Sequence, residues 1–170
     1  RRRGIQNILA LRGDPPAGVG EFQRPTDGFE YARELVEYLR RRGGFSVGVA
    51  GCPEGHIACK AGKHVDWGHL KEKIEAGADF VITQLFYDNA YFHEFTDHLR
   101  NKLHVTVPIV PGVLPIIAAV RLEHLTQLCG ATIPPALRSR LSELAGNEEA
   151  LNAFGVEYAT RQCEELLKAG

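Results

Sequence analysis

Polar residues interrupt or end several apolar runs, which is where parallel α/β proteins place their chemistry. Asp14 follows the apolar stretch 5–11 and stands between Gly13 and two prolines, which would hold a carboxylate without mobile loop residues. Gln84 interrupts the apolar stretch 80–86, and an amide buried without partners is costly. Each residue also has a structural explanation, because Asp14 can accept hydrogen bonds in a turn and Gln84 can join a backbone network.

A further candidate follows the apolar stretch 45–51. His56 stands in a short loop with Glu54 and Gly55. A metal site at His56 is not favoured, because no second histidine stands at a spacing typical of metal ligands. Two roles stay open for His56: a hydrogen bond to an anionic cofactor group, or a cap within its own loop.

One predicted helix combines three different polar groups. Asp66, His69 and Lys73 recur at i, i+3 and i+7, beside an apolar stripe that includes Trp67 and Leu70. A carboxylate, an imidazole and an ammonium at the border of the core are suited to the ribose and phosphates of a nucleotide. A solvated helix face has the same pattern, so both interpretations stand.

The elements that position these residues alternate between strand and helix. Strands are predicted at 5–11, 45–51, 78–88 with its exit loop, and 105–115. Helical spacing of apolar residues predicts helices at 29–42, 64–77 and 89–102, and two or three helices in 116–170 with breaks at 133–135 and near Gly146. A capping box of Asp27 and Glu30 is predicted before the first helix, on which Tyr31 either stacks on a flat ring or packs in the core.

Four strand–helix units predict a parallel sheet with helical crossovers. An open doubly wound sheet and part of an eight-stranded barrel both fit this pattern. The absence of a G-x-G-x-x-G turn after any predicted strand disfavours the dinucleotide-binding version of the first. Polar residues at the carboxyl ends of strands favour the barrel. Four units alone would leave two open sheet edges, so the fold class predicted for residues 1–170 is α/β, a partial (β/α)8 TIM barrel in one domain.

Composition limits the other classes of function. The 170 residues carry 20 basic and 21 acidic side chains, which predicts no nucleic-acid footprint. No apolar run is long enough to span a membrane, and the four cysteines lack the spacing of metal ligands or of a disulfide framework, so a cytoplasmic setting is expected. The chain begins with Arg and contains no Met, which we interpret as an internal fragment of a longer protein.

The triplet Arg12-Gly13-Asp14 also has the sequence of a cell-adhesion ligand. An adhesion role predicts a flexible exposed loop in a secreted protein. The preceding apolar strand, the two following prolines and the lack of a secretion signal all favour the end of a barrel strand instead.

Four motifs, "NILALRGDPP", "PEGH", "GADFVITQLFYD" and "VPIVPGVLPI", occur in this order and spacing. Together they resemble the methylenetetrahydrofolate reductase family over nearly the whole chain. The resemblance implies strands four to seven of a barrel that binds FAD. It also implies transfer of a hydride from NADH or NADPH to 5,10-methylenetetrahydrofolate, giving 5-methyltetrahydrofolate, by ping-pong turnover.

The same resemblance implies roles for individual residues. FAD contacts are expected at Arg12, Gly13, Asp14, Tyr31, Ala32, Ala50, His56, Asp66 and Lys73. Substrate contacts are expected at Asp14, Gln84, Phe92 and Leu125. Asp14 and Gln84 are the expected catalytic residues: Asp14 tunes the flavin potential and aids folate binding, and Gln84 binds folate and nicotinamide in turn. No metal is expected.

The chain also departs from the family pattern. Cys52 stands where some members have a cofactor-lining tyrosine, and the loop from His56 to Asp66 is about one residue longer than in several members. The family's general acid and its last-strand arginine have no counterpart in these residues. We therefore expect the isolated chain to be inactive. Separately, the full-length protein is expected to be a homo-oligomer. A pterin-binding methyltransferase barrel without flavin is the alternative function.

Overall fold

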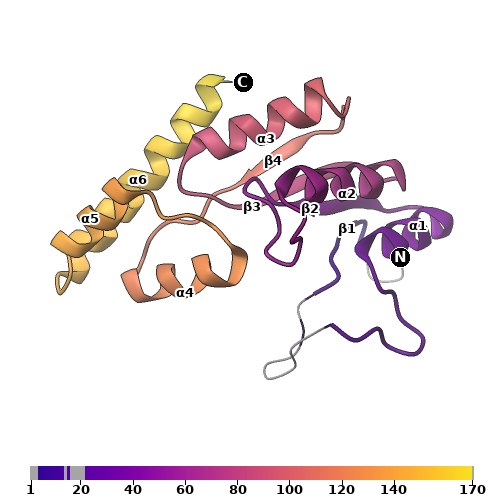
Figure 1. Ribbon diagram of the computed structural model, residues 1–170, viewed down its shortest axis with the longest axis horizontal. Coiled ribbons are helices and arrows are strands. Elements are labelled where there is room, and N and C mark those ends of the chain that lie inside the picture. Colours follow the sequence, from indigo (N-terminus) through magenta and orange to yellow (C-terminus); the bar gives the residue numbers. More distant parts are fainter. Residues whose placement is uncertain (1–3, 14, 16–21, 170) are drawn as a thin grey trace.

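The computed structural model describes residues 4–13, 15 and 22–169, and four parallel strands organise it (Figure 1). The strands are β1 (Asn7–Ala10), β2 (Ser46–Gly51), β3 (Phe80–Leu85) and β4 (Ile109–Gly112). They pair in the order β1-β2-β3-β4, all parallel. Doubly wound nucleotide-binding sheets reverse their strand order part-way, whereas barrel strands follow chain order. The observed order is that of a barrel segment.

Three helices cover one face of this sheet (Figure 1). They are α1 (Ala32–Arg42), α2 (Lys63–Glu75) and α3 (Asn89–Asn101). Right-handed crossovers between strands in chain order place successive helices on the same side. The core between the two layers contains the buried side chains of Ala10, Val36, Leu39, Val47, Val49, Trp67, Leu70, Ala78, Val81, Phe95, Leu99 and Val105.

The first helix begins later than predicted, and the capping box of Asp27 and Glu30 is wrong. Residues 25–28 form a turn in which the Gly28 N–H donates to the Pro25 carbonyl, so they are not available to start a helix. The cap comes instead from Glu34, whose Oε2 accepts the N–H groups of Glu30 at 2.7 Å and Tyr31 at 3.3 Å. The first and fourth strands are also shorter than predicted.

The tail forms three helices, α4 (Ala119–Cys129), α5 (Pro135–Glu143) and α6 (Glu148–Ala169). The predicted breaks at 133–135 and near Gly146 are confirmed. A second core, which includes Ile116, Leu122 and Leu137, holds this part together. Helix α6 is joined to the sheet side through Gln162, whose Nε2 donates to the Phe86 carbonyl at 2.8 Å.

The face of the sheet opposite α1–α3 is apolar and accessible. Leu9 is 42% exposed and Val110 is 47% exposed on this face. Gly48 lies beneath the Phe80 ring, and a Cβ there would overlap it. Parallel sheets normally cover both faces, and in a closed barrel this face points to the interior.

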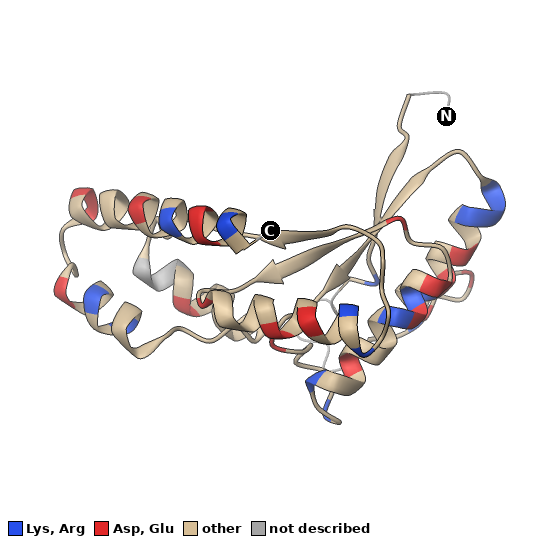
Figure 2. Ribbon diagram, turned by 90° about the horizontal axis from the view of Figure 1, so that it is seen from above, with Lys and Arg blue, Asp and Glu red and all other residues tan. Residues whose placement is uncertain are grey.

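Acidic and basic residues are interspersed along the helices (Figure 2). Several form ion pairs between neighbouring helices, such as Arg33 with Glu72 at 3.7 Å and Lys63 with Glu94 at 2.6 Å. Within the described ranges, no helix combines the length and apolar character needed to cross a membrane.

Two helical glycines provide a test of the packing. A Cβ at Gly155 in α6 would overlap the carbonyl oxygen of Ile116, whereas a Cβ at Gly68 in α2 would meet no atom within 4 Å. We expect Gly155→Ala to destabilise the fold by about 1–3 kcal/mol through overpacking. Gly68→Ala should stabilise it by about 0.5–1 kcal/mol, because alanine is the better helix former.

Urea unfolding of the complete natural polypeptide that carries this chain measures both changes, and Gly68→Ala is the matched control. Equal stabilisation by the two substitutions would contradict the close approach of α6 to the segment that follows β4.

Candidate active site

The carboxyl ends of the four strands define one edge of the sheet, because all four run in the same direction. Arg12 and Gly13 follow β1, the Cys52–His56 loop follows β2, and Gln84 lies near the end of β3. Gly13 has φ +82°, which a residue with a side chain adopts only under strain, so this position requires glycine. Asp14 lies outside the described residues, and its role stays a prediction.

Lys73 links α2 to β2 through another residue of the predicted cofactor site. Its Nζ donates to the Ala50 carbonyl at 2.7 Å, so two of the predicted residues are in direct contact. Burial lowers the pKa of Lys73, and the nearby Asp66 carboxylate opposes that shift. An ammonium has three donors, and this contact uses one of them. The remaining donors suit an anionic group.

Asp66 and His56 are also in contact. The backbone N–H of His56 donates to Asp66 Oδ2 at 3.1 Å, which fixes the loop after β2 against the first turn of α2. The His56 Nδ1 accepts the Ala58 N–H at 3.1 Å, so the ring turns its other nitrogen, Nε2, away from its own loop. The loop cap and the cofactor contact that the sequence left as alternatives are therefore compatible.

The polar stripe of α2 does not behave as a single solvated face. Lys73 and Asp66 are partly buried, whereas His69 is exposed. The burial of Lys73 and Asp66 therefore differs from that of a solvated helix face, whereas the exposure of His69 is typical of one. Trp67, on the same helix, is fully buried. Its Nε1 donates to the Cys52 carbonyl at 2.9 Å, so Trp67 also anchors the loop after β2.

Gln84 owes its position to an irregularity in β3. Ile82 pairs with Val110 and Leu85 pairs with Gly112, so β3 has one more residue than β4 between these pairs. Such bulges re-aim side chains next to active sites. Gln84 is exposed on the inner face of the sheet, and its Oε1 accepts the Leu85 N–H at 2.9 Å. This bond orients the amide and leaves its NH2 group as a donor.

The remaining predicted FAD residues lie near the start of α1. Arg12 places its guanidinium 5.0 Å from the centre of the Phe22 ring. Tyr31 is 54% exposed, which excludes the core role, and a hydrogen bond with Glu30 raises the pKa of its hydroxyl. Ala32 is the first residue of α1. These residues form a group separate from the Ala50–Lys73 contact.

Among the described residues, no hydrogen bond or aromatic ring pair joins Phe92 or Leu125 to Gln84. Phe92 lies in the first turn of α3, where its ring stacks on buried Phe86 at 5.3 Å between ring centres. Leu125 is half-buried on α4. Their substrate roles stay predictions.

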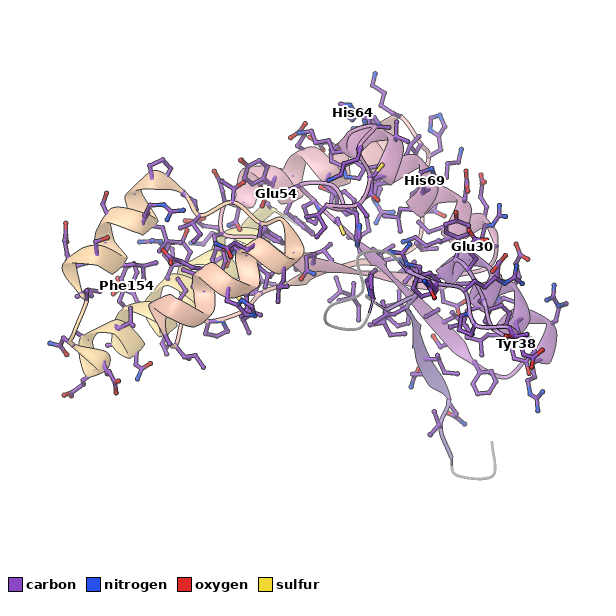
Figure 3. The ribbon with its side chains drawn as sticks, turned by 60° about the horizontal axis from the view of Figure 1, so that its bottom comes forward. Glu30, Tyr38, Glu54, His64, His69 and Phe154 are labelled. Carbon is purple, nitrogen blue, oxygen red and sulfur yellow. The ribbon has the colours of Figure 1, made fainter. Side chains whose placement is uncertain are left out.

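Glu54 provides a contact that the sequence did not reveal. Both of its carboxylate oxygens accept the Thr132 N–H, at 3.0 and 3.1 Å, across 78 positions of sequence. Figure 3 shows Glu54 on the side of the loop after β2 that faces the helices of the tail. A shallow pocket lies beside this contact, lined by Cys52, Pro53, Glu54, Gly55, Gln84, Leu85, Cys129, Gly130 and Ala131. The Glu54–Thr132 contact thus joins the two walls of the pocket, which are the loop after β2 and the segment after α4. Gln84 lines the same pocket.

Comparison with known proteins shows the family. The sequence profile of the family described as methylenetetrahydrofolate reductase matches residues 1–170. The chain belongs to this family. It is 38% identical over 180 residues to methylenetetrahydrofolate reductase (NADH) 1 of Arabidopsis thaliana, which covers 100% of this chain and 30% of the plant protein. It is 36% identical over 169 residues to a probable methylenetetrahydrofolate reductase (NADPH) of Caenorhabditis elegans, covering 98% and 25%.

The chain therefore spans about a third or less of the length of these reductases. A solved structure of an uncharacterized protein from Clostridium thermocellum, described as binding two copies of 5-methyl-5,6,7,8-tetrahydrofolic acid, resembles the fold with a TM-score of 0.57. The identity is 17%, and the match covers 96% of this chain and 62% of that one. The predicted resemblance and the predicted fold class, an α/β partial TIM barrel, are confirmed.

The two thiols Cys52 and Cys163 give a test of the electrostatics at this site. Burial, followed by the Asp66 charge, raises the pKa of Cys52 to about 12, whereas Cys163 is exposed on α6. Only the thiolate reacts with alkylating agents, and a rise of three pKa units lowers the thiolate fraction about a thousandfold. At pH 8 we expect iodoacetamide to label Cys163 at least about 100 times faster than Cys52.

Mass spectrometry of the folded natural polypeptide measures the two rates, and labelling in urea is the control that should remove the difference. Equal rates in the folded protein would contradict the burial of the Cys52 thiol.

Proposed function

We propose that the chain supplies part of the active site of an enzyme that reduces 5,10-methylenetetrahydrofolate to 5-methyltetrahydrofolate, with FAD as cofactor and NADH or NADPH as hydride donor. The whole-chain family match supports the reaction. The observation that carries the cofactor assignment is the Lys73–Ala50 contact beside Asp66, at the edge that also presents Gln84. FAD, when bound, would supply the hydride-transfer chemistry between the nicotinamide and the folate.

The residues present fit an anionic dinucleotide. The two unused donors of Lys73 suit phosphate oxygens, and His56 can donate from its outward nitrogen. Asp66 is held by the His56 N–H and suits ribose hydroxyls. Arg12, Gly13, Tyr31 and Ala32 would contact the flavin side from the start of α1. Cys52, with a neutral thiol, would replace the stacking residue found in some members.

Gln84 and Asp14 are proposed to serve the substrates. The amide NH2 of Gln84 faces the inner side of the sheet, where folate and nicotinamide would bind in turn at one flavin face. Asp14 would place a negative charge beside the flavin ring, which disfavours the anionic reduced flavin and makes it a better hydride donor. The folate ligand of the Clostridium thermocellum protein is compatible with a folate substrate on this fold.

The accessible inner face supports a larger assembly of strands. Apolar Leu9 and Val110 face away from the helices, as interior residues of a complete barrel do. We propose that residues 1–170 form strands four to seven of such a barrel, in a cytoplasmic homo-oligomeric enzyme. Relatives named for NADH and for NADPH both match the chain, and either donor is compatible with the proposal.

The flavin assignment is tested with Lys73→Met in the complete natural polypeptide. Removing a charge-assisted hydrogen bond costs about 1.5–3 kcal/mol, so the Kd for FAD should rise about 10- to 100-fold. Lys71→Met is the matched control, because Lys71 lies on the same helix and pairs with Glu75 at 3.5 Å. Quenching of flavin fluorescence measures the affinity.

A wild-type protein without flavin absorbance or affinity would overturn the reductase proposal. A folate-binding protein without flavin would instead favour the pterin-binding methyltransferase alternative.

The substrate role of Gln84 is tested with Gln84→Glu. The carboxylate can still accept the Leu85 N–H but loses the NH2 donor, so the local geometry is kept while the substrate contact is lost. We expect both half-reactions to slow, since both substrates would use this position. Gln127→Glu, an exposed change on α4 with the same added charge, should leave both rates unchanged. Stopped-flow absorbance of the flavin measures each half-reaction, and normal saturation of the variant by both substrates would contradict the role.

A further inference from the structure

The loop after β2 and helix α2 bring together a thiol, a carboxylate and an imidazole. One ligand atom each from Cys59, Asp66 and His69 lies within 4.8 Å of the others. Asp66 and His69 stand at i and i+3 on one helix face, and Cys59 comes from the turn just before the helix. His69 extends from α2 at the surface (Figure 3). The C-x6-D-x2-H spacing matches no common zinc motif, and the cluster becomes visible only when the loop is folded.

We propose that Cys59, Asp66 and His69 bind a divalent metal ion of the zinc class. A thiolate and an imidazole select borderline-soft ions such as Zn²⁺ or Co²⁺ over Mg²⁺ and Ca²⁺, which prefer oxygen ligands. Three protein ligands with a solvent-facing fourth position form a common tetrahedral arrangement. Thiolate, carboxylate and neutral imidazole together balance the two charges of the ion.

The surroundings of the cluster are prepared for such an ion. The His56 N–H holds Asp66 through Oδ2, which orients the carboxylate in the way that outer hydrogen bonds orient metal ligands. The lysines around the cluster have partners of their own: Lys60 donates to the Ile57 carbonyl at 3.0 Å, Lys63 pairs with Glu94 at 2.6 Å, and Lys73 donates to the Ala50 carbonyl at 2.7 Å. Bond lengths of 2.0–2.3 Å place tetrahedral ligands roughly 3.5 Å apart. Side-chain rotations that move the ligand atoms by about an ångström therefore complete the site. The Cys59 thiol, which contacts the Gly62 carbonyl at 3.7 Å, would lose its proton on binding.

The double role of Asp66 would couple metal binding to flavin binding. Asp66 is also a proposed flavin contact, so metal and flavin would compete for the same carboxylate. This second step rests on the proposed function. The metal would act as an inhibitor of flavin binding, and its own binding does not depend on any flavin.

Metal binding is tested by titrating Co²⁺ alone into the flavin-free natural polypeptide. A thiolate-to-cobalt charge-transfer band and the visible bands of tetrahedral Co²⁺ are expected. Cys59→Ser should remove the charge-transfer band, and His69→Gln should weaken binding at least about tenfold, since even outer partners of a metal are worth that much. Cys163→Ser is the matched control, because it removes an exposed thiol on α6. Circular dichroism without metal checks that each variant is folded.

The competition is tested by measuring the Kd for FAD with and without Zn²⁺. A weaker Kd in the presence of Zn²⁺ is expected for wild type and Cys163→Ser, and no Zn²⁺ effect is expected for Cys59→Ser. A cobalt band that persists in Cys59→Ser, or no band at all, overturns the metal site. Cobalt binding by a protein that never binds FAD overturns the proposed function and leaves the metal site standing. Cobalt binding with an unchanged FAD affinity overturns the competition alone.

Discussion

Parallel pairing in chain order is the constraint on which the candidate site depends. Because β1 to β4 pair successively and in one direction, the segments after each strand meet at one edge of the sheet. The same pairing sends each crossover to the same side, so α1 to α3 cover one face. The inner face is then left for side chains such as Gln84. A reversal of strand order would have separated these segments.

The Lys73 ammonium is an energetically costly group at this edge. Its partial burial lowers its pKa, and the Asp66 charge recovers part of the lost solvation. A packed hydrophobic residue would serve the fold at this position without that cost. The Ala50 carbonyl accepts one hydrogen bond from the Lys73 ammonium, and the other two N–H donors of this ammonium stay available at the edge of the sheet. This imbalance is typical of functional sites, where a desolvated charge is retained for a ligand.

Much of this arrangement could be predicted from the sequence. Helical spacing located α2 and α3 closely, because Trp67 and Phe95 mark buried faces, and proline at 134 and 135 marked the break in the tail. The start of α1 was missed, because an Asp–Glu pair at the correct spacing can lie in a turn. The Glu54–Thr132 contact was also beyond the sequence. Contacts that join residues 78 positions apart depend on tertiary packing, and no local pattern encodes them.

That contact is one of two that connect the two cores of the molecule. One core holds α1 to α3 against the sheet, and the other holds the tail helices together. Glu54 ties the loop after β2 to the start of the α4–α5 connection, and Gln162 ties α6 to the segment after β3. Gln84 lines the pocket beside the first contact and precedes Phe86, the partner in the second, by two residues. One wall of the pocket beside Gln84 therefore comes from the loop after β2 and the other from the α4–α5 connection, and the Glu54–Thr132 contact holds the two walls together.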